Sequence, residues 1–402
     1  MTAVPVGRRP FLAWMAGAAL LGAVPWAGRA GAQELRYFRI GTGTTSGTYF
    51  PIGGLIANAI SNPPGSRACD RGGSCGVPGL IAVAQATSGS VENIELLRNG
   101  TVEACLCQAD IAYWAYTATG RYASRPPFET LRSIGMLYAE ALHLVVGADS
   151  GIHAVTDLRG RRVSLGEEGS GTLVEARMIL EAYGIKLADI QPVYQKPGTS
   201  ADWLGQSKLD AFFMVGGPPV AAIADIAART PIRLIPLEGE VANRLRAEQR
   251  FYMDAVIPAG AYTGVPETRT LGVGAELLVR AELEPDLVHG ITAALWHDNT
   301  RRLLLEGHPK GRSMDPMKAV AGLSVPLHPG AERYYRATGL IGNAANEPGA
   351  TEPLDAQSPL TEEEPAVKEA SPDSPADDKP AADRTAADKP AKDRPPVHKA
   401  QP

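Results

Sequence analysis

The stretch IGTGTTSGTYFPIGG, residues 40–54, places a loop rich in glycine and hydroxyl groups between an apolar run and a helical pattern. Its core, SGTYF at residues 46–50, returns 124 residues later as SGTLV at residues 170–174. A second pair of similar segments, RNGTVEACLC ending at Cys107 and LGQSKLDAFFM ending at Met214, is offset by 107 residues. The repeat predicts two similar halves, and the difference of 17 residues between the offsets indicates an insertion around 69–75 in the first half.

Short apolar runs alternate with helical patterns along the chain, which predicts an α/β architecture with mostly parallel sheets. The runs expected to form buried strands are residues 80–84, 105–107, 142–146, 162–165, 211–215 and 232–235. The residues expected on buried helix faces are Ile52, Leu55, Ile56, Ala59 and Ile60, then Leu173, Ala176, Leu180 and Tyr183.

The chain is therefore expected to fold into two similar lobes joined by a hinge around a central cleft. The first lobe takes residues 33–147 and 251–342, and the second takes residues 148–250. The chain returns to the first lobe through the apolar segments 271–279 and 287–296, so at least two crossings join the lobes.

The charge is distributed unevenly along the 402 residues, of which 44% are apolar. The formal net charge of −5 divides into +3 for residues 1–32, −6 for residues 343–402 and −2 for the body between them. A nearly neutral body argues against a nucleic-acid partner, which requires a cationic surface. Residues 343–402 are rich in Pro, Ala and charged side chains, and we expect them to be disordered.

The first 32 residues have the pattern of a cleaved signal peptide. Arg8 and Arg9 precede an apolar run at residues 11–26, and Ala30-Gly31-Ala32 offers small residues for cleavage. The paired arginines are typical of a twin-arginine signal, and an ordinary secretory signal fits the same pattern. A membrane anchor is disfavoured because Pro25 interrupts a run that is short for a span. The mature chain is expected in the periplasm.

Four cysteines suit that compartment. Cys69 and Cys75 flank a glycine-containing loop that can fold back to form a disulfide. Cys105 and Cys107 are expected on one face of a strand as buried small hydrophobic residues. A metal site is the alternative for all four, although neither spacing is a standard zinc spacing.

The loop at residues 40–54 lacks the features of known reactive or phosphate-binding loops. Thr48 follows Gly47 where a Walker loop has Lys, and the glycine spacing misses the dinucleotide fingerprint by one residue. Neither a nucleophile elbow nor a histidine pair with metal-ligand spacing occurs in the chain. What remains is a strand–loop–helix junction, in which Thr48 is expected to cap the helix and Pro51 to lie in its first turn.

The second half repeats this junction, because GEEGSGT at residues 166–172 ends with Gly171 and Thr172 at a helix start. Two helix N-termini that face one cleft can bind an anionic group such as a carboxylate without any Arg. Ordinary helix caps and tight turns are the alternative interpretation of both loops.

Other candidates follow strand ends, where open α/β sheets bind ligands. These residues are Thr87, Ser88, Ser90, Gln108 and Asp110. We expect Asp110 either to pair with a ligand ammonium or to cap the helix after it. Tyr138 and Tyr194 are expected either to cover the apolar part of a ligand or to lie at the edge of the core.

Six segments taken in order resemble the TAXI-type solute receptors of TRAP transporters. They are IGTGTTSGTYFPIGG, GSVENIELLRNG, GSGT, DAFFMVGGPP, IPAGAYTG and VPLHPGAERYYRATGL, and the match spans residues 35–341. The resemblance implies a type II periplasmic binding-protein fold. The ligand-binding residues that it implies, together with Tyr138, are Thr44, Thr45, Ser46, Gly47, Thr48, Tyr49, Ser88, Gly89, Ser90, Gln108, Asp110, Ser170, Gly171, Thr172, Gly216 and Gly217.

The same resemblance implies a function in transport, without catalysis or a cofactor. A monomeric receptor would capture glutamate, glutamine or another small carboxylated solute and deliver it to TRAP membrane permease subunits driven by an ion gradient. Glu167 and Glu168 depart from the family pattern and stand where its members usually have small or neutral residues. A sensor module that presents its solute to a signalling protein, or an enzyme on the same fold, are the alternatives.

Overall fold

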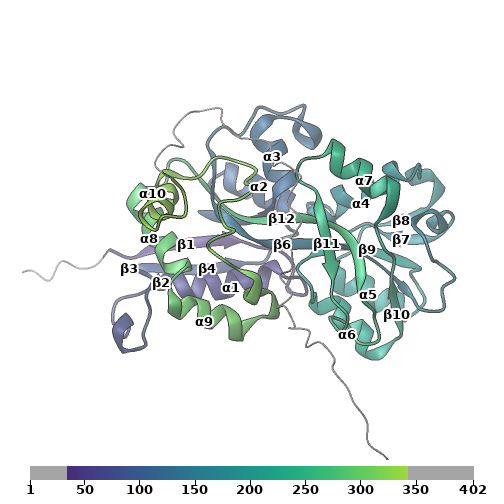
Figure 1. Ribbon diagram of the computed structural model, residues 1–402, viewed down its shortest axis with the longest axis horizontal. Coiled ribbons are helices and arrows are strands. Elements are labelled where there is room, and N and C mark those ends of the chain that lie inside the picture. The colour runs from purple at the N-terminus through teal and green to yellow at the C-terminus, as the bar shows by residue number, and fades with distance from the viewer. Residues whose placement is uncertain (1–33, 343–402) are drawn as a thin grey trace, which may run out of the picture. The chain divides into compact units, whose positions relative to one another are not determined.

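Strand β1 (Arg36–Gly41) precedes the glycine-rich loop and lies inside the first half of a mixed sheet (Figure 1). It pairs in parallel with β4 (Leu80–Gln85) on one side and with β5 (Ala104–Gln108) on the other. β12 (Thr268–Arg280) then pairs antiparallel with β5, and β6 (Leu131–Gly147) pairs antiparallel with β12. The first half therefore has the order β4-β1-β5-β12-β6.

The second half repeats this order. β7 (Arg162–Ser164) pairs in parallel with β8 (Gln191–Val193) and with β9 (Ala211–Gly216). The last part of β6, residues 141–146, pairs antiparallel with β9, and β10 (Ile232–Leu234) pairs antiparallel with β6. The order is β8-β7-β9-β6-β10, which matches the first half strand for strand.

This duplicated strand order confirms the expected two-lobed fold of the type II binding-protein class. The two lobes share β6, whose 17 residues pair with β12 at one end and with β9 and β10 at the other. β11 (Met253–Ile257) pairs with the first residues of β12 and forms the second crossing. Because β6 belongs to both lobes, the residue boundaries of the lobes stay a prediction.

The computed structural model describes residues 34–342. The expected signal peptide, residues 1–32, and the expected disordered tail, residues 343–402, lie outside these residues. Within residues 34–342, no helix combines the length and the apolar character needed to cross a bilayer.

Helix α1 (Tyr49–Ile60) begins directly after the glycine-rich loop. Ile52, Ile56 and Ile60 recur at helical spacing and are fully buried in the core of the first lobe. The other helices of this lobe are α2 (Ser90–Arg98), α3 (Ala109–Thr117), α8 (Pro285–Leu295), α9 (Asp298–Gly307) and α10 (Pro329–Ala337).

Helix α4 (Gly171–Ala182) follows the second copy of the loop, and Leu173, Ala176 and Leu180 are buried as predicted. The remaining helices are α5 (Pro197–Gly205), α6 (Ala221–Arg229) and α7 (Gly239–Glu248). One apolar core continues from α3 to α4 and includes Trp114 of the first lobe and Leu173 of the second. The lobes therefore share an apolar core on this side.

The predicted insertion holds the short strands β2 (Ser61–Asn62) and β3 (Val77–Pro78). Cys69 and Cys75 form a disulfide there, which confirms the expected bridge, and Asn299 Nδ2 donates to Cys75 Sγ at 2.9 Å. The metal alternative is wrong for this pair, because each sulfur is bonded to the other. Cys105 and Cys107 are free and fully buried, as predicted.

The short 3₁₀ helices complete the described elements. They are η1 (Cys69–Arg71), η2 (Gly120–Tyr122), η3 (Val155–Leu158), η4 (Leu187–Asp189) and η5 (Pro309–Ser313).

Replacing both Cys69 and Cys75 by serine should lower the free energy of unfolding by about 2 kcal/mol, because a bridge across a short loop removes conformational entropy from the unfolded chain. Urea unfolding of the full chain measures the change. An unchanged unfolding midpoint would show that the bridge does not constrain the unfolded state.

Candidate ligand-binding pocket

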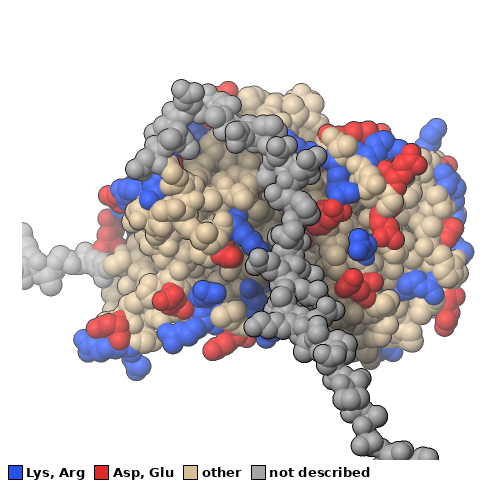
Figure 2. All heavy atoms as spheres, in the orientation of Figure 1, with Lys and Arg blue, Asp and Glu red and all other residues tan. Residues whose placement is uncertain are grey.

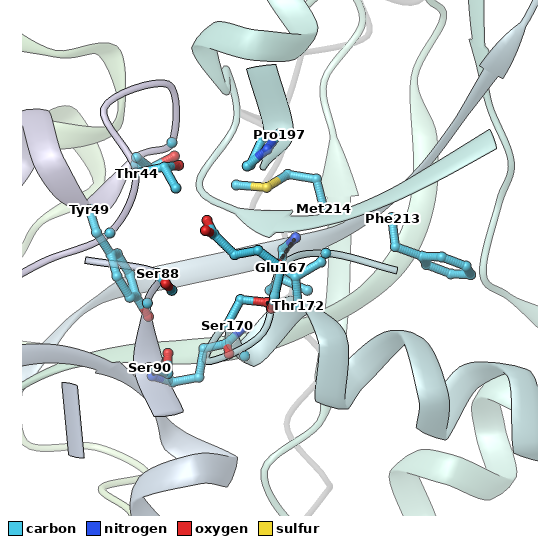
Figure 3. A pocket seen from close by; sticks show the side chains of 18 of the residues that line it. Thr44, Tyr49, Ser88, Ser90, Glu167, Ser170, Thr172, Pro197, Phe213 and Met214 are labelled. Carbon is cyan, nitrogen blue, oxygen red and sulfur yellow. Dashed lines mark hydrogen bonds between the residues drawn. The ribbon is translucent and has the colours of Figure 1, made fainter. Parts of the chain in front are cut away.

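A pocket lies between the two lobes at the C-terminal ends of β1, β4, β5, β7 and β8 (Figure 3). It holds about 50 Å³ of water-accessible space. The residues that line it in the first lobe are Gly43, Thr44, Gly47, Thr48, Tyr49, Ser88, Gly89, Ser90, Gln108 and Glu140. Those from the second lobe are Gly166, Glu167, Ser170, Gly171, Thr172, Gln195, Pro197, Phe213, Met214 and Val215.

Four helices begin at this pocket. Tyr49 starts α1, Ser90 starts α2, Gly171 starts α4 and Pro197 starts α5, and all four residues line the wall. The first N–H groups of a helix have no partner within the helix, and the helix dipole makes this end positive. None of the lining residues, all of them in the described part of the chain, is Lys or Arg. The wall thus offers amide donors without a cation.

Close approach of the lobes requires glycine at two positions of the wall. A Cβ atom at Gly171 would lie 1.4 Å from Gln108 Oε1, so α4 can rest against the first lobe only without a side chain there. Gly89, which precedes α2, has a φ of 123°, a conformation that is restricted to glycine. It faces Ser170 across the pocket.

Thr48 and Ser170, the residues that precede α1 and α4, have different roles. Ser170 caps α4, because its Oγ accepts a hydrogen bond from Leu173 N at 3.1 Å. The expected cap by Thr48 is wrong, since its hydroxyl makes no bond to its own helix. Thr48 Oγ1 instead donates to the carbonyl of Gly217 at 2.9 Å, which joins the lobes. Pro51 lies in the first turn of α1, as predicted.

Glu140, on β6, brings a buried carboxyl group to the pocket. It is 2% exposed and accepts a hydrogen bond from the hydroxyl of Tyr49 at 2.7 Å. Burial raises the pKa of Glu140 from 4.5 to about 8, against the opposing effects of the Tyr49 bond and the charge of Lys310. Lys310 lies behind the wall, with its ammonium 5.6 Å from the centre of the Tyr138 ring, and burial lowers its pKa.

Glu167 brings a second carboxyl group from the opposite lobe. Figure 3 shows its side chain extending toward the side of the pocket formed by Thr44 and Ser88. Burial raises the pKa of Glu167, and the nearby Lys196 and a hydrogen bond with Ser88 oppose that shift. The pocket therefore combines a positive potential from helix ends with two acidic side chains.

A buried network behind the pocket supports the wall at Met214. His143 Nδ1 donates to the carbonyl oxygens of Ala141 and Met214, at 2.9 and 3.2 Å. Its Nε2 accepts from the hydroxyl of Tyr262 at 2.8 Å, and that hydroxyl accepts from Val220 N. Burial lowers the pKa of His143 to about 4, so the ring is neutral near pH 7 and suits these partners.

The structure brings most of the predicted site residues to one pocket. Those that line it are Thr44, Gly47, Thr48, Tyr49, Ser88, Gly89, Ser90, Gln108, Ser170, Gly171 and Thr172. Thr45 and Ser46 line an adjoining cavity of about 540 Å³ that also contains Thr44 and Lys196. Gly216 and Gly217 lie behind the wall, where they contact the side chains of Thr48 and Lys310.

Asp110 and Tyr138 do not line this pocket. Asp110 is fully buried in the first turn of α3, and the residue that precedes this helix is Gln108, so the expected capping position is wrong. Tyr138 is 3% exposed and lies under Lys310. Tyr194 is 36% exposed and stacks near Arg177 on the surface.

Several wall residues were not predicted from the sequence. They are Gly43, Glu140, Gly166, Gln195, Pro197, Phe213, Met214 and Val215. Gln195 and Pro197 follow β8 at the position that Thr87 and Ser90 occupy after β4, so the repeat itself could have identified them. Figure 3 shows the ring of Phe213 directed away from the pocket, so this residue contributes mainly its backbone.

Charge on the surface does not favour a polyanionic partner. Basic and acidic side chains are interspersed on the face shown in Figure 2. This agrees with the nearly neutral body expected from the sequence.

Glu140→Gln should flatten the dependence of stability on pH. The raised pKa means that folded Glu140 keeps a proton that the unfolded chain releases near pH 4.5, so stability falls as pH rises from about 5 to 8. A difference of one bound proton between the folded and the unfolded chain changes the free energy of unfolding by about 1.4 kcal/mol per pH unit. Unfolding at several pH values should give a shallower slope for Glu140→Gln than for the wild type, while the exposed control Glu306→Gln keeps the wild-type slope. Equal slopes for both variants would contradict the assignment.

Three solved structures are distantly similar to this chain. The periplasmic aliphatic sulphonate binding protein SsuA from Escherichia coli is 16% identical, with a TM-score of 0.37 over 67% of this chain and 74% of that chain. The alkanesulfonate-binding protein SsuA from Xanthomonas axonopodis pv. citri, bound to MOPS, is 14% identical, with a TM-score of 0.36 over 75% and 84%. A putative L-cystine ABC transporter protein from Listeria monocytogenes is 13% identical, with a TM-score of 0.42 over 70% and 98%.

These likenesses are remote, and the assignment of the fold rests on the duplicated strand order. The sequence itself matches one family from residue 40 to residue 339, which covers both lobes. The chain therefore belongs to the NMT1-like family.

Proposed function

We propose that the chain is a periplasmic solute receptor that captures a small carboxylated solute by closing its two lobes. The observation that carries this proposal is the convergence of α1 and α2 from one lobe and α4 from the other on a pocket without Lys or Arg in its wall. Helix N-termini bind carboxylates through amide N–H groups and the helix dipole. The carboxylate of the solute lies at these amides.

The two acidic side chains narrow the class of solute. A solute with only negative charge would offer the carboxyl groups of Glu140 and Glu167 no hydrogen-bond donor, and it would be repelled by whichever of the two is ionised. An ammonium or amide N–H beside the carboxylate would instead donate to them and to Gln108 Oε1, which is buried and has no partner among the described residues. This pattern favours an amino-acid-like solute such as glutamate or glutamine over a di- or tricarboxylate.

Solute entry requires the lobes to separate. The pocket is small, and three hydrogen bonds cross between the lobes beside it. They run from Thr48 Oγ1 to Gly217 O, from Ala222 N to Ser46 O and from Glu92 N to Gly169 O, at 2.9, 3.1 and 2.9 Å. Rotation about the shared strand β6 breaks these bonds and opens the cleft.

The partner that we propose is the membrane permease of a TRAP-type transporter. The resemblance of six segments to TAXI-type receptors supports this assignment. The closed receptor then delivers its solute to the permease and performs no chemical reaction. A receptor of this kind works as a monomer outside the cytoplasm.

An amino-acid-like solute should raise the melting temperature of the full chain more than di- or tricarboxylates do. A ligand that binds only the folded chain adds RT ln(1 + [L]/Kd), about 2.7 kcal/mol at a hundredfold excess over Kd. Thermal-shift measurements across amino acids and carboxylic acids test this. The absence of a shift with every compound would contradict the receptor assignment.

Ser170→Asp should abolish binding of the solute that stabilises the chain most, whereas Ser170→Asn should retain it. Both replacements are good helix caps, so α4 begins normally in each. Only Asp places a negative charge where the carboxylate of the solute binds. Isothermal titration calorimetry of the two variants gives the comparison, and equal affinities would place the carboxylate elsewhere.

A further inference from the structure

Two acidic side chains meet across the lobes outside the ligand pocket. Asp110 lies in the first turn of α3 in the first lobe, and Glu175 lies on α4 in the second lobe. Both are fully buried, with 0% of each side chain exposed. Neither residue lines the ligand pocket, so the proposed solute contacts neither of them. The burial of two carboxyl groups side by side therefore needs an explanation other than solute binding.

The two carboxyl groups lie where α3 and α4 meet. Gly171, one turn before Glu175, abuts the side chain of Gln108 just before α3, and no side-chain donor among the described residues reaches the Asp110 oxygens or Glu175 Oε1. An ionised carboxylate only accepts hydrogen bonds, so a hydrogen bond between the two groups exists only when one of them is protonated. The hydroxyl of Tyr252 donates to Glu175 Oε2, and the backbone N–H groups of Asp110 and Ile111 act on the Asp110 carboxyl group.

The surroundings of the pair favour the protonated state. The titratable groups that act directly on the pair are Tyr252, Glu140 and Cys107, and none of them is basic. The cation Lys310 acts on Glu140, and none of the described groups that act on Asp110 or Glu175 is a cation. Burial raises the pKa of both carboxyl groups, and the charge of Asp110 raises that of Glu175 further.

We propose that Asp110 and Glu175 form a proton-dependent latch that holds the two lobes closed. The proposed receptor function gives this latch its purpose, because it would make retention of the solute depend on pH. In the closed protein the pair shares a proton while both side chains are fully buried. When the lobes separate, both groups regain water and release that proton.

The sign of the pH dependence follows from the direction of the shifts. The closed form binds more protons than the open form, so closure is favoured at low pH and is lost as pH rises through the raised pKa values. For one proton, the ratio of closed to open protein falls by up to about tenfold per pH unit. Solute would be held under acidic conditions and released as the pH rises.

Distances between spin labels on the two lobes test the latch in the full chain without any solute. Glu129→Cys in the first lobe and Lys208→Cys in the second are exposed positions for the labels. Pulsed electron paramagnetic resonance should show the short-distance population falling several-fold between pH 5.5 and pH 8.5. Equal populations at the two pH values would overturn the proposal.

Two glutamine variants assign the response to the pair. Glu175→Gln can donate to Asp110 at any pH, so its lobes should stay closed at both pH values. The matched control Glu181→Gln changes an exposed residue of the same helix and should keep the wild-type response. A wild-type response to pH in Glu175→Gln would overturn the proposal. If circular dichroism shows that Glu175→Gln does not fold, the variant Asp110→Asn takes its place in the same measurement. Because no solute is present, failure of the latch leaves the solute screen as an independent test of the receptor function.

Discussion

Backbone N–H groups at the starts of α1, α2 and α4 are the constraint on which the proposed site depends. Every helix leaves its first N–H groups without internal partners, and these groups must find an acceptor elsewhere. In the first lobe β1 lies between β4 and β5, and in the second lobe β7 lies between β8 and β9. In each lobe this order places the helices that follow these parallel strands with their N-termini at one edge of the sheet. Because both lobes repeat this order, two such edges face each other across the pocket.

The closed arrangement balances favourable contacts against buried acidic groups. Apolar packing between α3 and α4 and hydrogen bonds such as that from Thr48 Oγ1 to Gly217 O join the lobes. Against them stand the carboxyl groups of Asp110, Glu140 and Glu175, whose burial disfavours the ionised state. Acidic groups between closing surfaces make the energy of closure depend on protonation, and a solute that donates to Glu140 would shift the same balance.

The fold was largely predictable because its signals are local. The repeat of SGTYF as SGTLV predicts the two lobes, and the apolar runs predict β4, β5, β7, β9 and β10 close to their observed positions. Strand β6 was expected only at residues 142–146 and extends from Leu131 to Gly147. Its polar residues Ser133, Glu140 and His143 interrupt the apolar pattern, yet all are buried, and distant partners bond two of them, Tyr49 to Glu140 and Tyr262 to His143.

The site was predictable where loops recur and unpredictable where distant side chains meet. The hydroxyl and glycine loops of both lobes were predicted and do converge on the pocket. Glu140 was missed because its partner Tyr49 is 91 residues away, and a lone Glu in a strand has the pattern of a solvent-facing residue. The role of Thr48 was misassigned for the same reason, since its acceptor Gly217 lies on the other lobe.

The position of a bound carboxylate relative to the first turn of α4 tests the central claim most directly. A crystal structure of the full chain with the solute that stabilises it most would provide that position. The account predicts a carboxylate oxygen about 2.9 Å from the backbone nitrogen of Gly171 or Thr172. A carboxylate paired with Lys310 or another cation, with those amides facing water, would contradict it.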